Sequence, residues 1–107
     1  MFKLKDIKAN KGATLNHNGN MVSYKQGYQV SVKDLEIIPA YMLRKSHLIE
    51  ILNNLPDDVC LGVWIDNNKA YIDLSVRLTN KRQALAFGKK NNQLSIWNWK
   101  ASEAIAC

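Results

Sequence analysis

The stretch "GVWIDNNKAYIDLS", residues 62–75, decides the fold that this sequence predicts. Alternating apolar and polar residues flank an Asn-Asn pair, and asparagine accepts the positive φ angles that a two-residue hairpin turn needs. The expected register pairs Val63 with Ile72, Ile65 with Ala70 and Trp64 with Tyr71. Because side chains alternate between the faces of a sheet, the aliphatic residues share one face and the two aromatic rings share the other.

Two short helices are predicted on either side of this hairpin. The first begins near Arg44, ends before Pro56 and carries an apolar stripe at i, i+3, i+4 and i+7, formed by Leu48, Ile51, Leu52 and Leu55. The second covers "KRQALAFGKK", residues 81–90, with Asn80 as its N-cap and Gln83 at N3. Gly88 lies on the apolar side of that helix, where it permits close approach to the sheet.

Further strands are predicted before and after these elements. In "ATLNHNGNMVSY", residues 13–24, an Asn18-Gly19 turn sets Leu15 opposite Val22. Alternation in "YQVSV" predicts another extended run, which ends at Pro39. The segment "QLSIWNWK", residues 93–100, places Leu94 and Ile96 on one side and Trp97 and Trp99 on the other, and "EAIAC" adds a short extended piece.

The predicted fold class is α+β, with a single antiparallel sheet of about five strands and two short helices packed on one face. Residues 12–107 form one α+β domain. Residues 1–11 alternate lysine with single apolar residues, and we interpret them as a basic N-terminal arm, either flexible or paired as a short edge strand.

Composition places the chain among ordinary globular proteins, since 47% of its 107 residues are hydrophobic and 22% are charged. It contains no apolar run of the roughly 20 residues that a membrane span needs and no signal-peptide core, so a cytoplasmic location is expected. The two cysteines, Cys60 and Cys107, are too few for a disulfide framework. We expect free thiols, with Cys60 buried.

Positive charge is concentrated in the C-terminal third. The formal net charge is +6, and residues 1–73 carry nine Lys and Arg against eight Asp and Glu. Residues 74–102 carry six cations and no acid, namely Arg77, Lys81, Arg82, Lys89, Lys90 and Lys100. Such a patch attracts nucleic acid or an acidic protein surface, although it also serves plain solubility.

The aromatic face of the sheet and the cationic segment together give the predicted partner-binding residues. These are Trp64, Tyr71, Arg77, Arg82, Lys89, Lys90, Trp97 and Trp99. Tryptophan, tyrosine and arginine anchor protein interfaces, and tryptophans beside lysines also stack the bases of single-stranded nucleic acid. Two other interpretations stay open: cross-strand aromatic pairs that only stabilise the sheet, and a homodimer joined through the aromatic face.

Catalytic signatures are missing from the sequence. It has no phosphate-binding loop, no nucleophile elbow and no clustered His, Cys and Asp. His17 lies beside a turn, and His47 lies on a helix without a second ligand at i+4. Asp66 and Asp73 do not form a carboxylate pair, because Asp66 lies near the hairpin tip. We therefore predict a protein that is not an enzyme and that has no metal site and no cofactor.

The chain resembles small proteins carried by bacteriophages and other mobile elements, over most of residues 12–100. The resemblance rests on "GATLNHNGNMVSYKQGYQVS", on the strand Tyr71-Ile72-Asp73-Leu74-Ser75, on the helix from Ala84 to Gly88 and on the closing strand from Asn92 to Trp97. It implies a non-enzymatic binding protein in the cytoplasm of a bacterial host. Its partner would be a host protein or a ribonucleoprotein complex, with inhibition of a host nuclease or a CRISPR complex as the result. The alternative is a nucleic-acid-binding accessory protein that uses the basic C-terminal third.

Overall fold

The central hairpin has the register that the sequence predicts. The structure, a computed structural model, describes all 107 residues. Strands β4 (Cys60–Asp66) and β5 (Lys69–Leu78) pair Val63 with Ile72, Trp64 with Tyr71 and Ile65 with Ala70. Asn67 and Asn68 form the turn with φ angles of 51° and 62°, both in the left-handed region. The separation of aliphatic and aromatic residues onto opposite faces follows from this register.

The sheet is wider than expected, with seven antiparallel strands instead of about five. Their order is β2-β1-β4-β5-β3-β6-β7. The other strands are β1 (Gly12–Leu15), β2 (Met21–Val22), β3 (Tyr28–Pro39), β6 (Ser95–Asn98) and β7 (Glu103–Ala106). β3 pairs with β5 over most of its length, with two register irregularities. The short strands β2 and β7 form the two edges.

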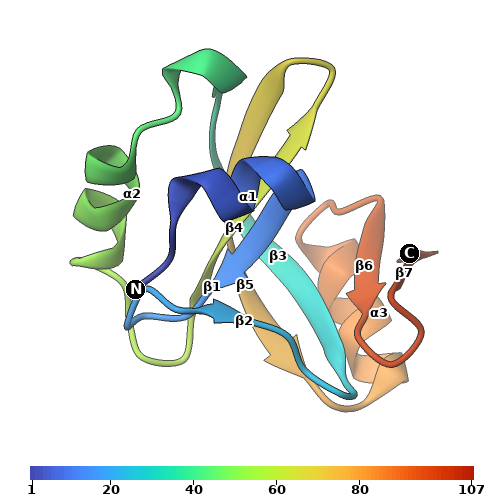
Figure 1. Cartoon of the computed structure of the whole chain (residues 1–107). Coiled ribbons are helices and arrows are strands. Elements are labelled where there is room, and N and C mark those ends of the chain that lie inside the picture. Colours follow the sequence, from blue (N-terminus) through green and yellow to red (C-terminus); the bar gives the residue numbers. More distant parts are fainter.

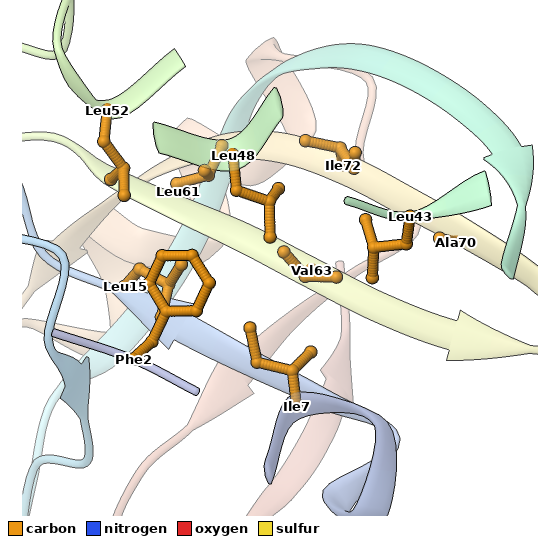
Figure 2. Close-up of a cluster of buried hydrophobic side chains, with 10 residues drawn as sticks. All are labelled: Phe2, Ile7, Leu15, Leu43, Leu48, Leu52, Leu61, Val63, Ala70 and Ile72. Carbon is orange, nitrogen blue, oxygen red and sulfur yellow. The ribbon is translucent and has the colours of Figure 1, made fainter. Parts of the chain in front are cut away.

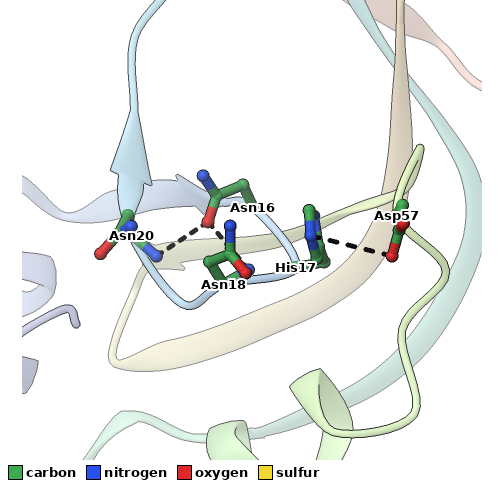
Figure 3. Close-up of polar contacts among 5 residues, drawn as sticks. All are labelled: Asn16, His17, Asn18, Asn20 and Asp57. Carbon is green, nitrogen blue, oxygen red and sulfur yellow. Dashed lines mark hydrogen bonds and ion pairs between the residues drawn. The ribbon is translucent and has the colours of Figure 1, made fainter.

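The first hairpin differs from the prediction by one residue. Leu15 pairs with Met21, and Thr14 pairs with Val22. The connection is a five-residue loop in which the Asn16 side chain accepts hydrogen bonds from the backbone N–H groups of Asn18 and Asn20, at 3.1 and 3.0 Å (Figure 3). The backbone turn closes earlier than predicted, with the Gly19 N–H donating to the Asn16 carbonyl at 2.9 Å and the Asn16 N–H donating to the Asn20 carbonyl at 3.0 Å, and the side-chain bonds of Asn16 support this shifted register.

Three α-helices are present, not two. The predicted helices are α2 (Lys45–Leu52) and α3 (Lys81–Lys90), and the Asn80 side chain caps α3 by accepting from the Gln83 N–H at 3.0 Å. The additional helix is α1 (Leu4–Asn10), within the segment interpreted as an arm. Phe2 and Ile7 of that segment are buried. A short 3-10 helix, Ala40–Met42, links β3 to α2.

The main core lies between α1, α2 and the aliphatic face of the central strands (Figure 2). It contains Phe2, Ile7, Leu15, Leu43, Leu48, Leu52, Leu61, Val63, Ala70 and Ile72. A second cluster contains Val30, Ala84 and Ile96 under α3. Val30 pairs with Val76, which is four residues from Ile72 on the same strand, so the helices cover the same face of the sheet. In the view of Figure 1, α2 and α1 lie towards the left and α3 lies towards the right, beside β6.

Gly88 brings α3 close to the sheet, as predicted. A Cβ at this position would lie 2.8 Å from Ile96 Cγ2 and 2.8 Å from Cys107 Sγ. Leu94, in contrast, does not join Ile96 in the core, because it precedes β6 and is 90% exposed. No helix of the structure has the length and apolar character needed to cross a membrane.

Candidate functional site

A cleft occupies the face of the sheet opposite the helices. Its volume is about 610 Å³, and residues of both edge strands, β2 and β7, contribute to its lining. The sheet is therefore curled so that its two ends approach the same cleft. Positions that alternate away from the core on the central strands contribute to the lining, including Gly62, Trp64, Tyr71, Asp73 and Ser75.

The charge of the lining contrasts with the charge of the chain. Twenty residues line the cleft, and neither a lysine nor an arginine is among them, although the formal net charge is +6. Asp73 is the one residue of that lining with a carboxylate. A low-dielectric cleft strengthens the field of a charge within it. The cleft is thus suited to neutral or cationic groups.

Trp64 forms an exposed part of the cleft wall, with 59% of its surface accessible. It pairs with Tyr71 on β5 and, on its other side, with Gly12 on β1. A Cβ at Gly12 would lie 3.4 Å from Trp64 Cε3, so the indole lies against a backbone position that has no side chain. Glycine at position 12 therefore leaves room for the indole ring beside β1.

Asp73 lies partly buried on the floor of the cleft. A side chain on its neighbour Gly62 would overlap the carboxylate, so glycine at this position makes room for it. Burial raises the pKa of Asp73 above the usual aspartate range; a hydrogen bond from Ser31 opposes this shift, and the charge of Asp34 adds to it. Asp34 is the residue that pairs with Asp73 across the β3–β5 ladder.

The raised pKa has a defined effect on stability. The folded protein binds the Asp73 proton more tightly than the unfolded chain does. Ionised Asp73 consequently lowers the free energy of unfolding at neutral pH, and this loss is recovered as the pH falls through the folded pKa towards the ordinary aspartate value. The ionised carboxylate therefore destabilises the protein when no ligand is bound.

A hydrogen-bonded network stabilises the wall of the cleft that contains Trp97 and Trp99, opposite Trp64. Gln29 is buried, its Nε2 donates to Ser75 Oγ at 2.8 Å, and its Oε1 accepts from Trp99 Nε1 at 3.1 Å. Trp99 in turn packs edge-on against Trp97, with ring centroids 6.3 Å apart. These contacts fix both indoles before any ligand arrives, which reduces the entropy cost of binding.

Arg77 is linked to this wall of the cleft through Tyr24. Its guanidinium lies 4.6 Å from the ring centroid of Tyr24, and it donates two hydrogen bonds to the Gln26 carbonyl, at 3.1 and 2.6 Å. Tyr24 packs edge-on against Trp99 at 5.5 Å. The Arg77 guanidinium is thus engaged by Gln26 and Tyr24 of the loop before β3, and it stabilises that loop.

Apart from Arg77, the predicted binding residues fall into two separate groups. Trp64, Tyr71, Trp97 and Trp99 line the cleft, as the alternation of the strands indicated. Arg82, Lys89 and Lys90 are exposed on α3, whose buried residues Ala84 and Gly88 face the sheet from its other side. The aromatic and cationic residues therefore do not form one continuous surface.

The remaining titratable groups do not build a second site. No group of three or more His, Cys, Asp and Glu side chains is placed to hold a metal ion. His47 contacts Glu36, and His17 Nε2 lies 3.7 Å from Asp57 Oδ1 (Figure 3). Both cysteines are free and Cys60 is buried, as predicted; burial raises the pKa of its thiol, which disfavours the nucleophilic thiolate.

Comparisons with protein-family models, with curated proteins and with solved structures returned no match.

Proposed function

We propose that this chain is a non-enzymatic binding protein that receives part of a partner in the aromatic cleft. The observation that carries the proposal is Trp64, a large apolar side chain left 59% exposed beside a cleft of about 610 Å³. Exposed tryptophans next to a concavity are typical of interface anchors. The opposing Trp97 and Trp99 are already fixed by packing and hydrogen bonds, which favours a preformed site.

The biological setting proposed here is that of a phage or mobile-element protein acting on a host protein or a ribonucleoprotein complex. Sequence resemblance alone supports this setting, including the inhibition of a host nuclease or a CRISPR complex. The cleft restricts the shape of the partner, which must present a protruding group that fits between Trp64 on one wall and Trp97 and Trp99 on the other.

The test is partner capture from a bacterial host lysate, with single variants on the two separate surfaces. Trp64→Ala removes the exposed indole, whereas Arg82→Glu reverses a charge on α3 and serves as the matched control. We expect Trp64→Ala to weaken capture by roughly tenfold or more, as for an interface anchor, and Arg82→Glu to retain it. Retention by Trp64→Ala together with loss by Arg82→Glu would contradict the proposal.

The nucleic-acid alternative has one observation in its favour, the four cations exposed on α3: Lys81, Arg82, Lys89 and Lys90. In this case α3, and not the cleft, would contact phosphates. Such binding weakens steeply with salt because counterions are released. Titration of a labelled single strand at several salt concentrations, with wild type and Arg82→Glu, distinguishes the two surfaces.

A further inference from the structure

We propose that the cleft recognises a single cationic side chain, an arginine or a lysine, on a peptide segment of a partner protein. This inference rests on the proposed function and specifies its ligand. The guanidinium or ammonium group would pair with Asp73 and lie against the faces of Trp64 and Tyr71.

Charge complementarity favours a cation over an anion. The lining holds the Asp73 carboxylate and no lysine or arginine. Asp34 adds a second carboxylate at the paired position on β3. Like charges placed opposite each other on neighbouring strands destabilise a sheet, and a bound cation would relieve that repulsion. A polyanion would find no counter-charge among the residues that line this cleft.

The strand register places the aromatic rings beside the carboxylate. Trp64 pairs with Tyr71, and the adjacent pair on the same face is Gly62 with Asp73. Residues two apart on a strand are separated by roughly 7 Å, which is within the span of a guanidinium that stacks on one group and hydrogen-bonds to the next. Gly62 contributes no side chain, and the Asp73 carboxylate fills the place that a Cβ on Gly62 would take.

The overall charge of the chain limits the partner to few cations. A net charge of +6 repels a polybasic segment at long range, whereas one isolated cation meets mainly the local field of Asp73. The expected ligand is accordingly a single basic residue in an otherwise neutral or acidic segment.

The experiment uses N-acetyl-arginine methylamide as the probe and the neutral isostere N-acetyl-citrulline methylamide as the control. Binding to the intact protein is followed by the indole N–H signals of the three tryptophans in NMR spectra. We expect the arginine probe to shift the Trp64 signal, and Asp73→Asn to weaken that binding by roughly tenfold or more, since a charge-assisted contact is lost. Equal binding of the citrulline probe, or unchanged binding by Asp73→Asn, overturns the inference.

Two measurements keep the result unambiguous. Thermal unfolding checks that Asp73→Asn is folded, and we expect it to be at least as stable as wild type at neutral pH because the buried charge is removed. In wild type, the arginine probe is expected to dissociate as the pH falls and Asp73 takes up its proton. If the probe fails to bind while Trp64-dependent partner capture persists, the cation inference alone is wrong; if both fail, the proposed function falls with it.

Discussion

Replacing Leu61 with alanine is expected to lower the free energy of unfolding by about 2–5 kcal/mol, the usual range for a fully buried leucine. Leu61 lies on the central strand β4, has no exposed surface and contacts the layer formed by α1 and α2. Removing its side chain leaves a cavity in the main core that the rigid sheet fills poorly. Denaturant unfolding followed by circular dichroism measures the change.

Leu94→Ala is the matched control for this substitution. The side chain removed is the same, but Leu94 is 90% exposed, so we expect a change within about 0.5 kcal/mol. Similar losses at Leu61 and Leu94 would contradict the assignment of the core to the aliphatic face of β4.

Gly12→Ala is expected to destabilise the protein by about 2–4 kcal/mol, because strain and overlap act together at this position. Gly12 has a φ angle of +150°, which residues with a side chain rarely adopt. A Cβ would also lie 2.8 Å from the Val63 carbonyl oxygen, a backbone atom that cannot move without disrupting the β1–β4 pairing. The same denaturant unfolding experiment measures this loss.

The consequence of Gly12→Ala extends to the cleft, since the new methyl group meets the Trp64 ring. We expect the emission of Trp64 to change even where the variant remains folded. Thr14→Ala, on the same strand and two residues away, is the control and should cost less than about 1 kcal/mol. Wild-type stability in Gly12→Ala would show that β1 does not approach β4 as closely as described.

The central hairpin could be predicted because two independent signals agree. An Asn-Asn turn and a strict alternation of side chains both fix the register of β4 and β5. The first hairpin lacks this agreement. There the Asn18-Gly19 dipeptide indicates a tight turn, but the Asn16 side chain organises a longer loop. Hydrogen bonds from a side chain to the backbone are not visible in a turn dipeptide.

Elements at the ends of the chain were harder to predict, because tertiary contacts determine them. Helix α1 has seven residues and is anchored by the burial of Ile7, not by a long apolar stripe. β2 has two residues and is defined only by pairing with β1. Patterns this short carry too little signal in the sequence alone.

The site was predicted in part. Alternation placed Trp64, Tyr71 and Trp97 on one face, which is where they lie. The curl of the sheet, which turns that face into a cleft, depends on how all seven strands pair. The roles of Asp73 and Gln29 were missed, although both share the alternating positions of the aromatic residues. Arg77 was counted with the cations of α3, and only the fold reveals its contact with Tyr24.

The most direct test of an open, cation-poor aromatic cleft is quenching of Trp64 fluorescence by ions of opposite charge. A Trp97→Phe, Trp99→Phe variant leaves Trp64 as the single tryptophan. Quenching by caesium and by iodide is measured, and each value is divided by that of free N-acetyltryptophanamide. We predict that relative quenching by caesium equals or exceeds that by iodide, despite the net charge of +6. Stronger relative quenching by iodide, or protection of Trp64 from both ions, would contradict the account.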